Sequence, residues 1–203
     1  MRTILALAAL SAISSSFPDL PKDRSARLEK GEVVVATRIP EGSNVVYVVS
    51  EGVVDAAPER VWALIEKCDG YAGTMPRIAA SSELSRKETP AGTVVRCRVT
   101  ADMPFPIPDL TSTTEARHTV GGGRFERAWT LIEGDYHTNA GRWVLTPFVD
   151  DQARTLARYE LAIETKMPAP KSLVESAQER TIPKMYESLR THTKPTPSTT
   201  PAP

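Results

Sequence analysis

Residues 53–65 have the sequence VVDAAPERVWALI, and this stretch decides the fold. Its two leading valines end a β-branched run that begins at Val45 and is typical of a strand. Pro58 then stands where the first residue of a helix belongs, because its missing N–H costs nothing there. The apolar spacing that follows predicts a helix reaching Cys68. The chain therefore passes from a strand into a helix with only a short link between them.

The flanking segments predict more strands and a second long helix. Residues 32–39 are β-branched, and the turn composition of residues 41–44 joins them to the central strand as a hairpin. Residues 71–75 predict a short helix and residues 171–190 a long one. Apolar residues near one face of the long helix are Leu173, Ala177, Met185 and Leu189. The remaining strand-like segments are residues 80–86, 93–101, 110–119, 124–132, 141–146 and 154–163.

This order of elements defines an α+β fold. An antiparallel sheet of about six to eight strands has one face to cover, and the C-terminal helix is the only element large enough to cover it. With 203 residues, the chain is long enough for one domain with a real core. The 25 basic residues balance the 25 acidic ones, and this zero net charge argues against a nucleic-acid partner.

One strand favours a hollow interior over a filled one. In residues 110–119, alternate side chains on one face are small or mildly polar and end at His118. A central strand of this kind leaves volume for a ligand. The alternative is an edge strand, which needs no bulky side chains. The sequence leaves both open.

The two ends of the chain are predicted to lie outside the domain. Residues 1–16 combine Arg2, an apolar run and a serine-rich exit, which is typical of a secretory signal peptide. The alternative is an ordinary first helix. Residues 193–203 are rich in proline and threonine and are predicted to be disordered. The domain then spans residues 17–192, and we expect the protein to be exported to the periplasm or secreted.

The chain has two cysteines, Cys68 and Cys97, too few for a disulfide scaffold or a structural zinc site. In an exported protein the two cysteines can form a disulfide if the helix that ends at Cys68 contacts the strand that contains Cys97. Otherwise they are two small buried apolar side chains. Both interpretations stay open at this point.

Several stretches resemble the START, polyketide cyclase/dehydrase and birch-pollen-allergen-like superfamily. Residues 53–65 resemble its first strand and helix, and the segment from Tyr71 to Ser81 resembles its second helix and second strand. The loop 104–109 is similar to a proline-rich connection of START-like members, except that Leu110 stands where those members usually have arginine. The closing matches are residues 141–147, 155–161 and 182–190.

This resemblance covers residues 31–192 and implies the helix-grip fold, a curved antiparallel sheet around a long C-terminal helix with an interior cavity. Members bind lipids, sterols, polyketides or other apolar molecules, and a minority catalyse cyclisation or dehydration. The superfamily has no universal catalytic motif, so the resemblance implies a cavity without implying a reaction.

The residues themselves supply no reaction either. No phosphate-binding, metallohydrolase or nucleophile-elbow motif is present in the sequence. His118 and the Asp135–His137 cluster offer titratable groups, but the cluster is typical of a polar turn, and a third metal ligand is missing. Asp150 and Asp151 are adjacent and predict a turn. We expect no catalytic residue, no metal and no cofactor.

The large side chains are better candidates for a ligand site. Arginine is an alternative, because Arg124, Arg127 and Arg142 together would hold an anionic head group, although charged outer faces of strands are commoner. The predicted ligand-binding residues are Tyr71, Met75, Phe105, His118, Trp129, Trp143, Tyr159 and Met185.

The sequence thus predicts an exported carrier for a lipid or similar hydrophobic small molecule, with transient membrane contact. The alternative is a cyclase- or dehydrase-type enzyme acting on a polyketide-like substrate, with His118 or Asp135 as its titratable group. A chaperone-like role is a third option. The sequence makes no prediction of oligomeric state.

Overall fold

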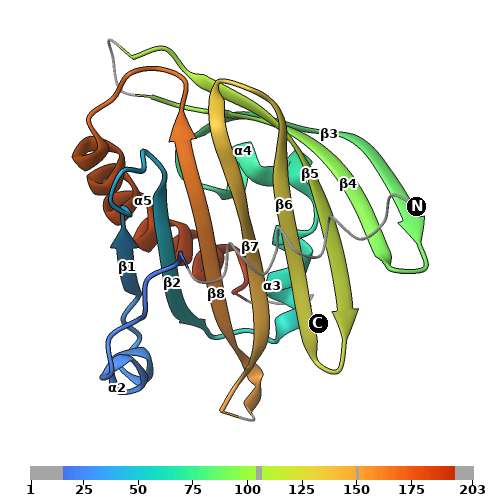
Figure 1. Cartoon of the computed structure of the whole chain (residues 1–203). Helices are drawn as coiled ribbons and strands as arrows, with labels where there is room; N and C mark the ends of the chain where they lie inside the picture. The colour runs from blue at the N-terminus through green and yellow to red at the C-terminus, as the bar shows by residue number, and fades with distance from the viewer. Residues whose placement is uncertain (1–15, 104–106, 150, 195–203) are drawn as a thin grey trace, which may run out of the picture.

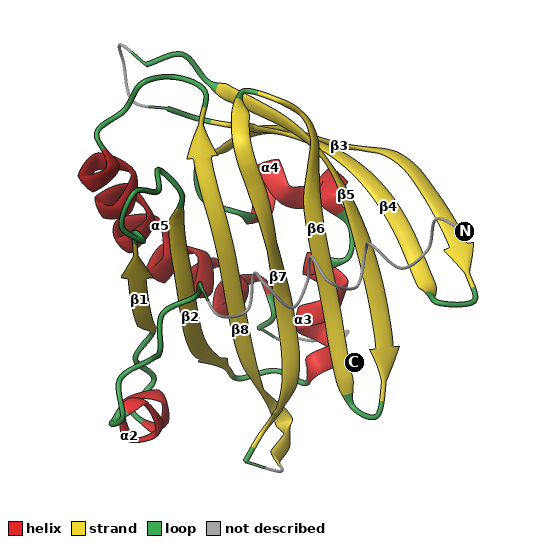
Figure 2. Ribbon diagram, viewed as in Figure 1, coloured by secondary structure: helices red, strands yellow, loops and turns green. Residues whose placement is uncertain are grey.

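A computed structural model describes residues 16–103, 107–149 and 151–194. Eight antiparallel strands form one sheet in the order β1-β2-β8-β7-β6-β5-β4-β3. The sheet is curved, and the helices formed by residues 58–74 and 171–192 lie on its concave side, as Figures 1 and 2 show. The strands are β1 (Val34–Arg38), β2 (Val46–Val54), β3 (Ile78–Thr89), β4 (Gly92–Ala101), β5 (Leu110–Gly121), β6 (Arg124–Gly134), β7 (Tyr136–Phe148) and β8 (Asp151–Thr165).

The helices divide into two groups. Helix α5 (Lys171–His192) crosses the concave face behind β1, β2 and β8 (Figure 1). Helices α3 (Pro58–Ile65), η1 (Cys68–Gly70) and α4 (Tyr71–Thr74) follow one another behind the other half of the sheet. A short helix, α2 (Arg24–Glu29), precedes β1. The predicted helix-grip architecture, its hairpin and its closing helix are confirmed.

The predicted bounds differ most at two strands. β3 and β7 are both longer than their sequence patterns indicated, and β7 begins at Tyr136 inside the predicted polar turn. Pairing of β7 with β8 begins at Tyr136 and Thr165, so the ladder overrides the polar composition of this segment. Only Asp135 lies between the end of β6 and the start of β7.

Strand β5 is a central strand. It pairs with β4 on one side and β6 on the other, which excludes the edge-strand alternative. Its alternate residues from Leu110 to His118 are all buried, as their shared face requires. The small-residue face of this strand therefore belongs to the interior.

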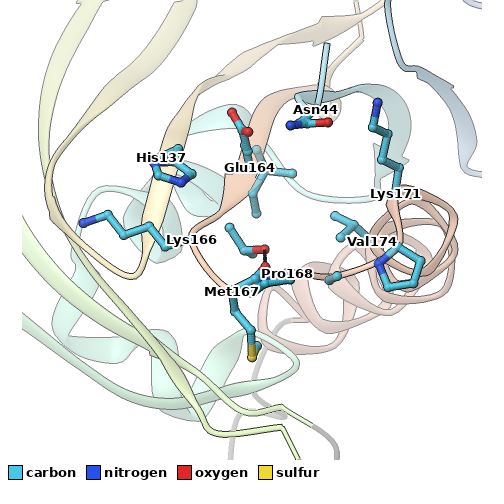
Figure 3. A pocket seen from close by; sticks show the side chains of 12 residues that line it. Asn44, His137, Glu164, Lys166, Met167, Pro168, Lys171 and Val174 are labelled. Carbon is cyan, nitrogen blue, oxygen red and sulfur yellow. Dashed lines mark hydrogen bonds between the residues drawn. The ribbon is translucent and has the colours of Figure 1, made fainter. Parts of the chain in front are cut away.

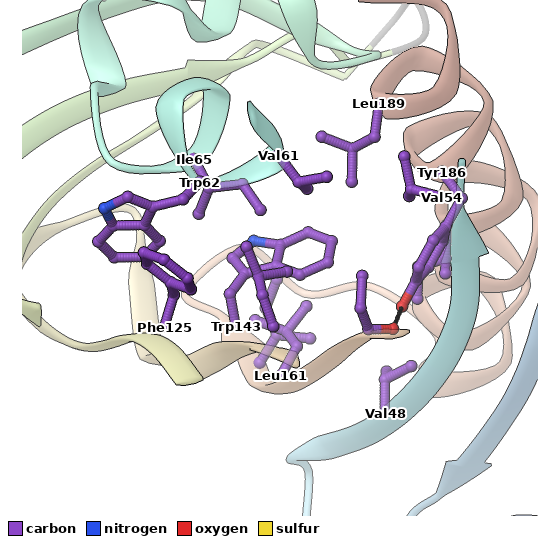
Figure 4. Close-up of a cluster of buried hydrophobic side chains, with 14 of the residues drawn as sticks. Val48, Val54, Val61, Trp62, Ile65, Phe125, Trp143, Leu161, Tyr186 and Leu189 are labelled. Atoms are coloured by element: carbon purple, nitrogen blue, oxygen red, sulfur yellow. Dashed lines mark hydrogen bonds between the residues drawn. The ribbon is translucent and has the colours of Figure 1, made fainter. Parts of the chain in front are cut away.

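The main core lies between the sheet and the helices. Helix α5 contributes Ile182, Tyr186 and Leu189, whose spacing places them on one face (Figure 4). The prediction that Leu173 belongs to this face is wrong, because Leu173 is 45% exposed. At about 100° per residue, nine residues of separation put it opposite Ile182.

The convex face carries buried charge. Glu51 on β2 and Glu160 on β8 both accept hydrogen bonds from Arg158, at 2.7 and 2.8 Å. Arg142 on β7 donates to the other oxygen of Glu160 at 2.6 Å. Burial alone would raise the pKa of Glu160, but the two guanidinium groups outweigh it and hold that pKa below its usual range. This network joins three neighbouring strands.

Candidate functional site

Aromatic side chains from three strands and one helix form a continuous row on the concave face. Trp143 on β7 is paired in register with Tyr159 on β8, and their ring centroids are 4.7 Å apart. Trp129 on β6 stacks on the other side of Tyr159 at 5.8 Å, and Tyr186 of α5 meets Trp143 at 5.9 Å. We call these four residues the aromatic row. The row brings together Trp129, Trp143 and Tyr159, three of the predicted ligand-binding residues.

A glycine lets this row form. A side chain at Gly141 would place its Cβ 2.6 Å from the Trp129 ring and 2.2 Å from the carbonyl oxygen of Glu160. Only glycine therefore allows the indole to lie against β7. The indole N–H donates to Asn139 at 3.0 Å, and the Asn139 amide donates to Ser112 at 3.2 Å. The sequence analysis missed Gly141 and Asn139, whose alternation with Trp143 along one strand was the available signal.

Tyr159 combines a deep position with remaining accessible surface. Burial raises the pKa of its phenol well above the ordinary value of 10. Yet Tyr159 and Trp129 are only partly buried, whereas Trp143 is 4% exposed. Both rings of this stacked pair therefore keep some accessible surface.

A buried arginine lies beside the row. Arg127 is two residues before Trp129 on β6, so the two side chains share a face of the strand, and Arg127 is only 3% exposed. Its guanidinium donates to Nε2 of His118 at 2.6 Å and to Sγ of Cys97 at 3.2 Å. It also lies 5.8 Å from the centre of the Tyr71 ring. We call Arg127, His118, Cys97 and Tyr71 the Arg127 cluster.

His118 is held in one neutral form by this cluster. An arginine can only donate, so Nε2 of His118 accepts and its proton resides on Nδ1. Burial, and then the charges of Arg127 and Arg86, lower the pKa of His118 from 6.5 to about 3. Trp62 packs edge-on against the imidazole, with centroids 5.1 Å apart. A histidine that stays neutral and is already hydrogen-bonded is a poor general base near neutral pH.

The His118 pKa predicts an acid-dependent loss of stability. In the unfolded chain the histidine takes up a proton near pH 6.5, and in the folded chain only near pH 3. The unfolded state therefore binds more protons inside this window, and the contribution is lost as the pH falls from about 6.5. Compared with His118→Gln, the wild type should lose about 2 kcal/mol more between pH 7 and 4.5.

Urea unfolding of both proteins at the two pH values measures this difference. The glutamine variant controls for every other titrating group, since only the imidazole is removed. Equal losses in both proteins would mean that His118 does not titrate in this way.

A disulfide joins the helical cover to the sheet. Cys68, in η1, is bonded to Cys97 on β4, which resolves the two interpretations of these residues. Tyr71 packs against this pair, and its hydroxyl donates to the carbonyl of Ile65 at 2.5 Å. Burial raises the pKa of Tyr71, against the opposing effect of the Arg127 charge. The disulfide thus fixes η1 and the start of α4 above the Arg127 cluster.

The other predicted residues have different surroundings. Met75, which follows α4, and Met185 on α5 are partly buried against the main core, so both remain near the concave face. Phe105 lies outside the described residues. Arg124 and Arg142 do not join Arg127: Arg124 pairs with Glu126 at 2.7 Å, and Arg142 pairs with Glu160. Because side chains alternate along a strand, Arg124 and Arg127 lie on opposite faces of β6. This alternation could have shown from the sequence that Arg127 is the inward-facing arginine.

His137 and Asp135 lie away from the aromatic row. The Asp135 carboxylate accepts from the backbone N–H of Thr111 at 2.7 Å. His137 lines a pocket of about 430 Å³ between β8 and the start of α5, which Figure 3 shows together with Lys166, Lys171 and Glu164. Its apolar side is formed by Ile163, Met167 and Val174, which also pack against the main core. A second pocket, of about 490 Å³, includes Arg98 and Asp135.

Residues 16–103, 107–149 and 151–194 contain no cluster of three side chains suited to hold a metal ion. No helix in those same ranges is both long enough and apolar enough to cross a bilayer.

Comparison with known proteins agrees with this geometry. The model of the family described as polyketide cyclase/dehydrase and lipid transport matches residues 54–190, well over half of the chain. The chain belongs to this family. A search of curated protein sequences finds no relative.

Solved structures share the fold at low sequence identity. A STAR-related lipid transfer protein fragment from Xanthomonas axonopodis is 18% identical, with a TM-score of 0.65 over 86% of this chain and 97% of that one. The Zhui aromatase/cyclase from Streptomyces sp. R1128 is 18% identical, with a TM-score of 0.59 over 73% and 93%. The human StarD13 lipid transfer and protein localization domain is 10% identical, with a TM-score of 0.67 over 97% and 100%.

Proposed function

We propose that this protein is an exported carrier that holds a lipid or another hydrophobic small molecule against the aromatic row. The observation that carries the proposal is the pair Trp129 and Tyr159, stacked at 5.8 Å and partly accessible deep under the helices. Stacked rings give an apolar guest a large contact area at a low cost in side-chain entropy. Lipid transport is also one of the two activities in the family description.

The other activity, cyclisation or dehydration, has less support from the site. His118 is kept neutral by its low pKa and is already engaged by Arg127. Asp135 lies near the opposite end of β5, beside Thr111. At about 3.3 Å per residue, the seven residues between Thr111 and His118 span roughly 23 Å, too far for the two groups to act on one bond. We therefore favour binding.

Export is part of the proposal. The predicted signal peptide lies mainly in residues 1–15, outside the described part. The Cys68–Cys97 disulfide supports an oxidising compartment, because such bonds rarely persist in the cytosol of mesophiles. A carrier in an aqueous compartment also has reason to touch membranes transiently when it loads or unloads.

Native mass spectrometry of the protein purified from its exported fraction tests both parts. The expected result is a chain that begins near Phe17 and carries a stoichiometric apolar adduct, which solvent extraction then identifies. An empty chain that shows no thermal shift with lipids or polyketides would contradict the carrier proposal. A full-length chain found only in the cytosol would contradict export alone.

A second test measures how tightly a neutral dye binds when one residue of the aromatic row is changed. Tyr159→Leu should weaken binding of N-phenyl-1-naphthylamine about tenfold, because the ring that contacts both Trp129 and Trp143 is lost. Tyr47→Leu is the matched control, since Tyr47 is a partly buried tyrosine that packs against Phe17 and lies outside the aromatic row. Equal affinities in both variants would place the dye elsewhere.

A further inference from the structure

The positive charge of Arg127 has no matching negative charge in direct contact. Its side chain is 3% exposed, and no carboxylate of the described residues lies within 4.0 Å of its guanidinium. The acceptors that it does have are the neutral imidazole of His118 and a disulfide sulfur. Sulfur is a weak acceptor. Buried charges in proteins are normally paired with an opposite charge, and we therefore expect a negatively charged group to bind Arg127.

Glu83, a carboxylate on which the Arg127 charge acts, already pairs with another arginine. Glu83 on β3 holds Arg86 through both oxygens, at 2.8 and 2.7 Å. This hydrogen bonding, opposed by burial and helped by the charges of Arg86 and Arg127, lowers the pKa of Glu83. Glu83 is therefore ionised and cancels Arg86. Glu83, Arg86 and Arg127 together therefore carry one net positive charge, which resides on Arg127.

The position of this charge relative to the aromatic row is the second observation. Arg127 is paired in register with Trp143 and is two residues from Trp129 on the same strand. Side chains two apart on a strand share a face, and the guanidinium extends from β6 toward His118 on β5 and Cys97 on β4. It therefore lies past the β6 end of the row, on the side away from β7 and β8. A flat or extended apolar body on the row would bring its end group to Arg127.

We propose that the natural ligand carries a carboxylate, and that Arg127 binds this group while the apolar body lies on the aromatic row. The proposal rests on the carrier function above and narrows its ligand class. A guanidinium matches a carboxylate in shape and charge and can donate two parallel hydrogen bonds to it. His118 orients the guanidinium through Nε2 and stays neutral, so it adds no competing charge.

A single net charge favours a carboxylate over a phosphate monoester. A phosphate monoester carries close to two negative charges at pH 7, and the second would lie buried without a cation, since Arg86 is held by Glu83. An uncharged ester or alcohol would leave Arg127 without a counter-charge.

The test compares end groups on one apolar chain. Dodecanoate, methyl dodecanoate, dodecanol and dodecyl phosphate are titrated at pH 7.5 against the full chain loaded with N-phenyl-1-naphthylamine. Dodecanoate should displace the neutral dye at about tenfold lower concentration than the ester or the alcohol, as expected for charge-assisted hydrogen bonds in a buried site. Dodecyl phosphate should be weaker than dodecanoate.

Two arginine variants test whether the preference for the acid over the ester depends on Arg127. Arg127→Gln should reduce the ratio between acid and ester to about one. Arg124→Gln, the control on the same strand, should keep the full ratio because Arg124 pairs with Glu126 away from the row. The comparison of end groups on the wild type stays decisive even if Arg127→Gln fails to fold.

The outcomes separate the two proposals. Equal binding of acid and ester by the wild type would overturn the carboxylate assignment and leave the carrier function standing. Tighter binding of dodecyl phosphate would overturn the choice of carboxylate. A preference for the acid that survives in Arg127→Gln would remove Arg127 from the site. If neither the dye nor any chain binds, both proposals fail.

Discussion

Gly52→Val is expected to lower the free energy of unfolding by about 3 kcal/mol or more, a large loss for an exchange of one hydrogen for a small side chain. A Cβ at Gly52 would lie 2.5 Å from Cδ1 and 2.8 Å from Cε1 of Tyr186. The ring cannot move aside easily. It is fully buried, and its hydroxyl is 3.1 Å from both Ser50 Oγ and the carbonyl oxygen of Ala157. The variant therefore pushes α5 away from β2.

Chemical unfolding of the wild type, the three single variants and one double variant checks this result. Gly73→Ala is the matched control, because a Cβ there meets no atom within 4 Å and alanine favours the helix. It should change stability by less than about 1 kcal/mol. Gly52→Val combined with Tyr186→Ala should cost at least about 1 kcal/mol less than the sum of the two single changes, since the clash is then removed. Strict additivity would mean that the two residues do not compete for space.

Removal of the disulfide is the second large effect. Cys68 and Cys97 are 29 residues apart in sequence, so the bond restricts a long loop in the unfolded chain. A loop of that length corresponds to about 3–4 kcal/mol in the chain-entropy description. For a protein of this size the melting temperature should fall by roughly 10 °C. The Cys68→Ala/Cys97→Ala variant and the reduced wild type should behave alike.

Thermal unfolding with and without a reductant measures the contribution of the disulfide to the melting temperature. The double variant is its own control, because a reductant should leave its melting temperature unchanged. A wild type that melts at the same temperature under both conditions would contradict the expected contribution. Weaker dye binding in the double variant would further indicate that the bond positions η1 above the Arg127 cluster.

The local patterns of the sequence predicted the fold well. The strand–helix junction at residues 53–65, the hairpin before it and the C-terminal helix all depend on periodicity and capping, which act between near neighbours. Alternation predicted which side chains of β5 share a face, whereas the central position of β5 in the sheet had been left open against an edge position. Short connections between successive strands also place β3 to β8 side by side in sequence order, whereas the pairing of β2 with β8 joins distant parts of the chain.

The missed features depend on contacts between distant parts of the chain. Gly52 makes room for Tyr186, which is 134 residues later, and no local pattern predicts that approach. The length of β7 depends on its pairing with β8. The inward direction of Arg127 could have been predicted, since it lies two residues from Trp129 on one strand. Its burial without a carboxylate depends on how β4, β5 and α4 close around it.

The aromatic lining has one practical consequence. The chain contains three tryptophans, and all of them face the concave side: Trp129 and Trp143 in the row, and Trp62 against His118. Intrinsic emission of this protein therefore arises entirely from its interior. Occupancy of the space under the helices should shift or quench that emission without any label, and the rate of the change would report how fast a guest enters and leaves. The protein carries its own optical probe of loading.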